Sequence, residues 1–168
     1  MMKLMGSALI AGAAAFLGFR AAARLRGQLR ALDEIGAGLE LLERELELYA
    51  PELRELMERL EARTKGCGTA LFTDFAAALA RGEGTVAGQW ERCVSQLEEL
   101  VPEGKLCLSS LGEVLGRYDS REQCRCVAAV RSRLERIRES EGALCQSRCR
   151  TCQTIGLSGG AFLVILLL

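Results

Sequence analysis

The sequence contains no histidine, and this absence excludes several kinds of active site. Histidine is the commonest general base and the commonest metal ligand in proteins. A nucleophilic triad that depends on His is therefore impossible here. The chain also has no Gly-Lys-Ser or Gly-Lys-Thr sequence, so it lacks a phosphate-binding loop of that type. These absences remove the commonest general base, the commonest metal ligand and one type of phosphate site. We expect no enzymatic activity, no catalytic, cofactor-binding or metal-binding residues and no small-molecule substrate.

Proline and net charge are also scarce. The 168 residues include only 2 prolines, and 22 basic residues balance 22 acidic ones. A nucleic-acid-binding protein usually carries a basic excess on one face, so the balance argues against nucleic acid as a partner. Few prolines, many Ala, Leu, Glu and Arg residues, and no alternating strand pattern predict an all-α fold.

Two uncharged stretches lie at the ends of the chain. The first, residues 4–19, would cover about 24 Å as a helix, and extension through Ala23 approaches the roughly 30 Å of a bilayer core. The second, residues 154–168, would cover about 22 Å and could cross a thinned bilayer. We therefore expect a transmembrane segment at 1–23 and another at 154–168.

Arginines flank both stretches on the side of the central domain. Arg20, Arg24, Arg26 and Arg30 follow the first stretch, while Arg148 and Arg150 precede the second. Because Lys and Arg gather on the cytoplasmic side of a membrane, we expect residues 24–153 to form a cytoplasmic helical bundle held at the membrane by both ends.

A secretory signal peptide is the alternative interpretation of the start. Met-Met-Lys could serve as its basic region, and the following alanines offer small-residue cleavage sites. A secreted domain with 8 cysteines would then be a disulfide scaffold. The arginines after the first stretch and the second uncharged stretch favour the membrane-anchored interpretation instead.

Helical periodicity divides the chain into about six helices. Proline and glycine mark most of the boundaries: Pro51, Gly66 with Gly68, Gly82 with Gly84, Pro102 with Gly104, and Gly116. Thr85 is the expected N-cap of the fourth helix, and Ser120 and Gln123 have the spacing of a capping box at the start of the last helix. The expected helices run from Arg20 to Tyr49, Glu52 to Arg63, Thr69 to Arg81, Thr85 to Leu100, Leu106 to Leu115, and from Ser120 onward.

The first and last helices carry the longest apolar stripes. The first stripe comprises Leu25, Leu29, Leu32, Ile35, Leu39, Leu42 and Leu46; the last comprises Val127, Val130, Leu134, Ile137 and Leu144. We expect these helices to pack as an antiparallel pair that the four shorter helices cover, with Trp90 as a core anchor. Six acids that have Arg44, Arg54 and Arg59 as neighbours are expected to be surface charge: Glu40, Glu43, Glu47, Glu52, Glu55 and Glu58.

The cysteines suggest a second type of chemistry. Cys145, Cys149 and Cys152 have the spacing of the iron–sulfur motif of radical S-adenosylmethionine enzymes. That motif requires a loop in a barrel of strands and helices, whereas here the three residues share one face of a predicted helix. Cys124 and Cys126 point to opposite sides of a helix and make a poor chelate. We interpret the cysteines as small apolar residues.

Several stretches resemble the stage III sporulation protein AB family. They are an amino-terminal apolar segment with Gly18 before a basic helix, residues 39–45 (LELLERE, against the family's LxLLExEI), residues 111–116 followed by Asp119, Ser120 and Gln123 (against LGxxLGxSDxxxQ), and the apolar carboxy terminus. The resemblance extends over the whole chain in the correct order. Tyr118 departs from the pattern, and the cysteines are not part of it.

The resemblance implies a role in endospore formation. It implies a component of a channel-like complex that links mother cell and engulfed forespore, located in the mother-cell membrane facing the forespore. The domain would be similar to the cytoplasmic domain of the type II secretion F platform protein, and a hexameric secretion-type ATPase would be a partner. Self-association into a homo-oligomer is compatible with this role.

Two other functions stay open at this point. One is an F-like platform fragment of a general type II secretion or pilus system, which neighbouring genes would distinguish. The other is a cysteine-ligated redox or cluster enzyme, which a metal-free and colourless protein after anaerobic purification would exclude.

Overall fold

The computed structural model describes the backbone of residues 2–49, 52–82, 84–117 and 119–167, and the side chains of residues 19–49, 52–82, 84–117 and 119–146. Within these ranges the chain is all-α and contains no strand, as the sequence predicts. Its elements are α1 (Met2–Leu48), α2 (Leu53–Glu61), α3 (Gly66–Arg81), α4 (Val86–Gln96), α5 (Pro102–Ser109), the 3-10 helix η1 (Ser110–Glu113) and α6 (Ser120–Leu167).

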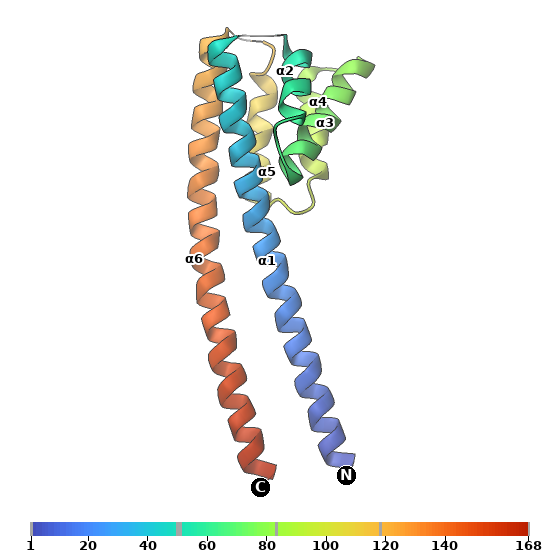
Figure 1. The fold of residues 1–168 in the computed structure, drawn as a ribbon, viewed down its shortest axis with the longest axis vertical. Helices are drawn as coiled ribbons and strands as arrows, with labels where there is room; N and C mark the ends of the chain where they lie inside the picture. The colour runs from blue at the N-terminus through green and yellow to red at the C-terminus, as the bar shows by residue number, and fades with distance from the viewer. Residues whose placement is uncertain (1, 50–51, 83, 118, 168) are drawn as a thin grey trace. The chain divides into compact units, whose positions relative to one another are not determined.

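The chain divides into two compact units. Met1–Gly27 and Ser140–Leu168 form one, and Gln28–Glu139 forms the other, which we call the bundle. Within the bundle, α1 lies between α6 on one side and α2, α3 and α4 on the other (Figure 1). Because Asp33 pairs with Arg138 and Glu43 pairs with Arg131, α1 and α6 run antiparallel, as expected from their apolar stripes.

The core of the bundle joins the two stripes to the aromatic residues of α3 and α4. Five residues of the α1 stripe and three of the α6 stripe are buried: Leu32, Ile35, Leu39, Leu42, Leu46, Val127, Val130 and Leu134. Trp90 is fully buried, which confirms it as a core anchor, and its ring packs edge-to-face on Phe75 at a centroid distance of 4.9 Å. The expectation for Leu144 is wrong, because this residue is 50% exposed.

Two helix starts differ from the sequence prediction. α5 begins at Pro102 rather than at Leu106, because proline is well suited to the first helical position, where no N–H donor is needed. Leu106 consequently lies within α5 and is 76% exposed. α3 begins at Gly66 rather than at Thr69, so the glycines at 66 and 68 open α3 instead of ending α2.

One predicted cap is confirmed and one is wrong. The backbone N–H of Gly88 donates to Thr85 Oγ1 at 3.2 Å, so Thr85 caps α4. Ser120, in contrast, is the first residue of α6 and not its cap. The carbonyl of Asp119 accepts from the N–H groups of Glu122 and Gln123 and thereby opens the helix.

The predicted membrane segments are not described in full. Residues 154–168, like most of 1–23, lie outside the residues whose side chains the structure describes. Among the described residues, no helix has a stretch both long and apolar enough to cross a membrane.

Candidate functional site

The contact between α1 and α2 is organised around a buried carboxylate. The side chain of Glu45 is only 9% exposed, and its two oxygens lie 3.4 Å from Arg59 Nη1 and 2.5 Å from Arg63 Nη1. Arg59 lies in the last turn of α2, and Arg63 lies in the turn that follows the helix. The sequence places Glu45 beside Leu42 and Leu46 of the apolar stripe, and this position is the one signal that could have identified it as buried.

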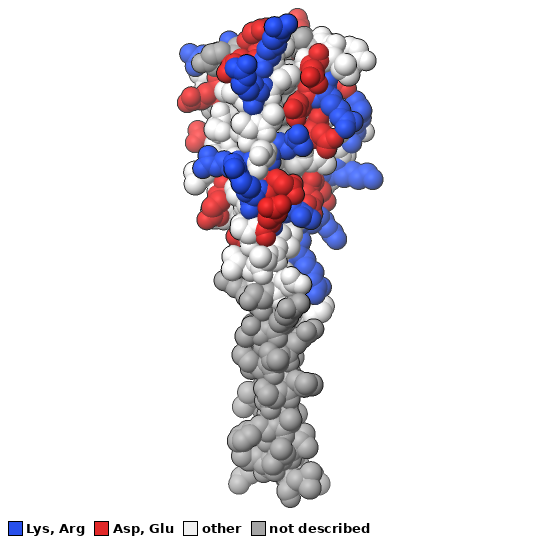
Figure 2. Space-filling model, turned by 90° about the vertical axis from the view of Figure 1, so that its left-hand side faces the viewer, with Lys and Arg blue, Asp and Glu red and all other residues white. Residues whose placement is uncertain are grey.

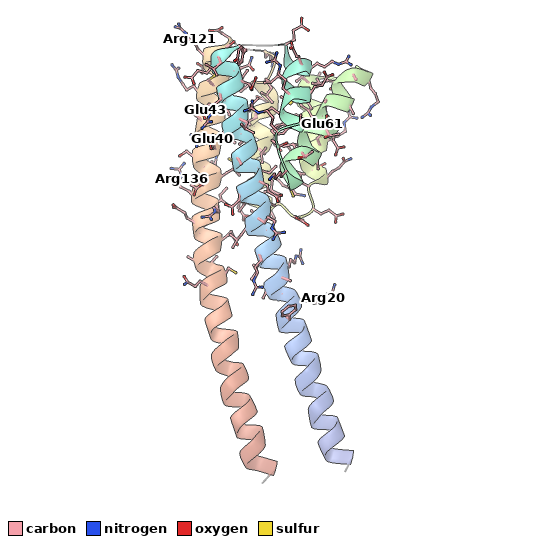
Figure 3. All side chains as sticks on the ribbon, viewed as in Figure 1. Arg20, Glu40, Glu43, Glu61, Arg121 and Arg136 are labelled. Carbon is pink, nitrogen blue, oxygen red and sulfur yellow. The ribbon has the colours of Figure 1, made fainter. Side chains whose placement is uncertain are left out.

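The contact between α1 and α6 uses half-exposed ion pairs. Arg131 Nε lies 3.2 Å from Glu43 Oε2, and Asp33 binds Arg138 seven residues further along α6. Cys124 Sγ also donates to the carbonyl of Glu43 at 3.7 Å. Glu43 lies on the side of α1 next to α6 (Figure 3), so the expectation that it is an exposed surface charge is wrong.

The surface ion pairs predicted along α1 and α2 are present. Arg44 pairs with Glu40 at 2.6 Å, Arg59 with Glu55 at 2.8 Å and Arg54 with Glu58 at 3.2 Å, each four residues apart on its own helix. Figure 2 shows basic and acidic side chains intermixed over the described part of this face. Such exposed pairs contribute little to stability, typically about 0.3–0.5 kcal/mol each.

The first turn of α3 docks on α1 through another carboxylate. The N–H of Cys67 donates to Glu34 Oε2 at 2.8 Å, so an acid from α1 accepts an N–H at the start of α3. Gly66 makes this approach feasible, because its φ is +54° and a Cβ there would lie 2.0 Å from Glu34 Oε2.

The stretch 111–116, which resembles the family motif, packs under Trp90. The indole Nε1 donates to the carbonyl of Leu108 at 2.8 Å. A Cβ on Gly112 would lie 3.0 Å from the Trp90 ring and 3.2 Å from the backbone of Ala87, so glycine allows the close packing. The motif residues therefore position helices, and they do not assemble a reactive site within the described part of the chain.

Four thiols, those of Cys67, Cys93, Cys107 and Cys124, are poor nucleophiles and poor metal ligands. Burial is the largest cause that raises the pKa of Cys67 to about 11, and the carboxylates of Glu99 and Glu34 contribute to the same rise. Burial is also the main cause that raises the pKa of Cys93, Cys107 and Cys124. Thiols with a raised pKa stay protonated near neutral pH, whereas nucleophilic attack and metal binding require the thiolate.

No group of three or more Cys, Asp or Glu residues is placed to hold a metal ion among the described residues. Cys145 is buried. Cys149 and Cys152 lie outside the residues with described side chains, so the structure does not test the cluster that their spacing suggests.

The described surface of the bundle includes a polar pocket and a mainly apolar groove. A polar pocket of about 200 Å³ between α3 and α4 is lined by Asp74, Arg81, Gln89, Arg92, Cys93 and Gln96, with two alanines. A groove of about 300 Å³ lies between α5–η1 and α6 and is mainly apolar; we call it the α5–α6 groove. For a protein without a reactive centre in its described part, such surfaces are the candidate functional sites.

Comparison with known proteins identifies the family. No curated protein matches the chain. A solved structure of stage III sporulation protein AB (SpoIIIAB) is 20% identical, with a TM-score of 0.63, and the match covers 71% of this chain and 97% of that one; at this identity it shows a shared fold. The family model for stage III sporulation protein AB matches residues 3–168. Because that match extends over nearly the whole sequence, the chain belongs to the stage III sporulation protein AB family and is a sporulation protein.

Proposed function

We propose that the chain is a non-enzymatic adaptor of the channel-like complex between mother cell and forespore. Residues 24–153 lie in the mother-cell cytoplasm, and the segments 1–23 and 154–168 anchor both ends in the mother-cell membrane that faces the forespore. A hexameric secretion-type ATPase of the same complex is the proposed cytoplasmic partner. Family membership supports the sporulation role, and the remaining points are our inference.

The observation that carries this proposal is the ion pair between Asp33 and Arg138. Asp33 lies near the point where α1 enters the bundle, and Arg138 lies near the point where α6 leaves it. Because the two side chains touch, the chain enters and leaves the bundle at one end. A domain with both flanking segments in one membrane requires this arrangement.

The charge pattern next to the bundle agrees with such an orientation. Arg20, Arg24, Arg26 and Arg30 are all exposed. Exposed arginines just inside a membrane segment favour retention on the cytoplasmic side and attract anionic headgroups. The protonated thiols described above support an adaptor over a thiol-dependent enzyme.

Deletion of the gene tests the sporulation role. We expect the deleted strain to complete engulfment and then fail to form heat-resistant spores, and we expect the intact gene to restore them. Full-length protein purified in detergent from sporulating cells should bring the ATPase with it. Normal spore yield in the deleted strain would contradict the proposal, and absence of the ATPase would contradict the partner assignment.

A further inference from the structure

The α5–α6 groove combines an apolar floor with a positive end. Its apolar lining comes from both sides: Leu111 and Val114 of the η1 region, and Ala129 and Val130 of α6, with the thiols of Cys107 and Cys126. Among the lining residues that the structure describes, Arg133 is the only charged one. Leu106 is 76% exposed and lies one helical turn before Ser110 of the lining, so the apolar surface continues beyond the groove.

Two arginines of α6 form the positive end of the groove. Arg133 and Arg136 are the two charged groups that act on the Cys107 thiol, and both lower its pKa against the larger effect of burial. Neither guanidinium forms an ion pair with a residue that the structure describes, whereas their neighbours Arg131 and Arg138 are paired with α1. In Figure 3, Arg136 points outward from α6. The positive end is thus available to an anion.

We propose that the α5–α6 groove binds a helix of another protein, which inserts an apolar side chain over Val114 and Val130 and places a carboxylate on Arg133. This inference rests on the adaptor function proposed above and names a partner surface for it. Charge complementarity selects the occupant, because the groove offers apolar area with cations at one end. A carboxylate one helical turn from an apolar residue fits this pattern.

The site differs from the interior contacts of the bundle in a way that suits reversible binding. A guanidinium can bind a carboxylate through two parallel hydrogen bonds, which fixes the orientation of the partner. The apolar lining supplies area that is removed from water on binding. The exposed side chains of Arg133 and Ala129 can be changed without opening the core.

Site-specific photocrosslinking in sporulating cells tests the proposal. A photoreactive amino acid at Leu106 of the full-length chain, which is exposed beside the groove and does not line it, should crosslink to a peptide in which a carboxylate lies one helical turn from an apolar residue. Arg133→Glu should reduce this crosslink by about tenfold, as expected for loss of a charge-assisted contact, while Arg133→Lys should retain most of it. Changing the partner's carboxylate to lysine should restore the crosslink in the Arg133→Glu chain.

Four results would overturn the inference: a crosslink to lipid only, a crosslink to a second copy of this chain, no crosslink, or a crosslink that Arg133→Glu leaves unchanged.

A second experiment measures spore yield. Ala129→Trp should fill the groove and lower spore yield, whereas Ser132→Trp, on an exposed part of the same helix outside the groove, should not. Equal melting temperatures of the two variants will separate loss of binding from loss of folding. If Ala129→Trp leaves sporulation normal while gene deletion blocks it, the groove assignment is wrong and the adaptor function stands.

Discussion

α1 uses carboxylates toward both of its neighbours, but the two contacts differ in burial. Toward α2, Glu45 is 9% exposed and binds two arginines. Toward α6, Glu43 and Asp33 are 25% and 51% exposed, and each binds one arginine. A buried charge that loses its partners is left without compensation, whereas an exposed one is solvated by water. We therefore expect loss of the arginines that bind Glu45 to cost more stability than loss of the ion pairs toward α6.

The apolar seam between α1 and α6 should matter more than either set of ion pairs. Leu134 is 1% exposed and Leu39 is fully buried. Leu134→Asp or Leu39→Asp would bury a charge without a partner, and we expect each to unfold the bundle, because the cost is comparable to a total stability of about 5–15 kcal/mol. Circular dichroism and thermal melting will check this. Ser132→Asp is the matched control on an exposed part of α6, and a Leu134→Asp bundle with a normal melting temperature would contradict the paired-helix core.

The buried carboxylate should produce the next largest effect. Replacing Arg59 and Arg63 together by Ala leaves Glu45 buried without a cation, and we expect a loss of about 2–3 kcal/mol in the free energy of unfolding by urea. Adding Glu45→Gln should recover part of this loss, since it removes the uncompensated charge. If the third substitution destabilises the bundle further, Glu45 is solvated more fully than its burial indicates.

Gly66 and Gly82 provide a comparison at the two ends of α3. Both have positive φ, +54° and +68°, but a Cβ at Gly82 would meet open space, whereas one at Gly66 would meet the Glu34 carboxylate. Gly82→Ala should cost about 1 kcal/mol from backbone conformation alone. Gly66→Ala should cost about twice as much or more, measured by urea unfolding, because Glu34 must also move. Equal costs would argue against the docking of α3 on Glu34.

The ion pairs of α1 should give the smallest effects. Glu43→Gln removes the pair with Arg131 across two helices, and we expect a loss of about 1 kcal/mol in the free energy of unfolding. Glu40→Gln removes an exposed pair within one helix and should change it by less than about 0.5 kcal/mol. An effect of Glu40→Gln as large as that of Glu43→Gln would remove the distinction between interhelical and intrahelical pairs.

Periodicity predicted the architecture because the helical stripes of the longest elements are also the core. Leu32, Ile35 and Leu39 follow the period of a helix and are buried where the pattern places them. The motif at 39–45 could be matched to the family, yet the pattern alone did not separate Glu43 and Glu45 from the exposed Glu40. Their partners lie on other segments of the chain, and contacts between distant parts of a chain leave no local periodicity.

The boundaries were harder to predict because glycine and proline have more than one role. Pro102 and Gly104 were interpreted as a turn, but Pro102 opens α5, and Gly104 lies inside it with close neighbours in Leu100 and Leu32. Gly66 was interpreted as the end of α2, although its positive φ belongs to the start of α3. The α5–α6 groove could not be predicted either, because it depends on which faces of three elements remain uncovered after packing.

Thiol labelling of sporulating cells tests the central claim, that the bundle lies in the mother-cell cytoplasm. The native thiols are poor reporters, because Cys93 and Cys107 are buried and the pKa of Cys67 is about 11. Ser132 is exposed, so Ser132→Cys provides an accessible thiol whose labelling can be compared with that of the unmodified chain. A charged maleimide that does not cross membranes should label Ser132→Cys only after the cells are permeabilised. Full labelling of this residue in intact cells would contradict the doubly anchored cytoplasmic adaptor and favour the secreted alternative.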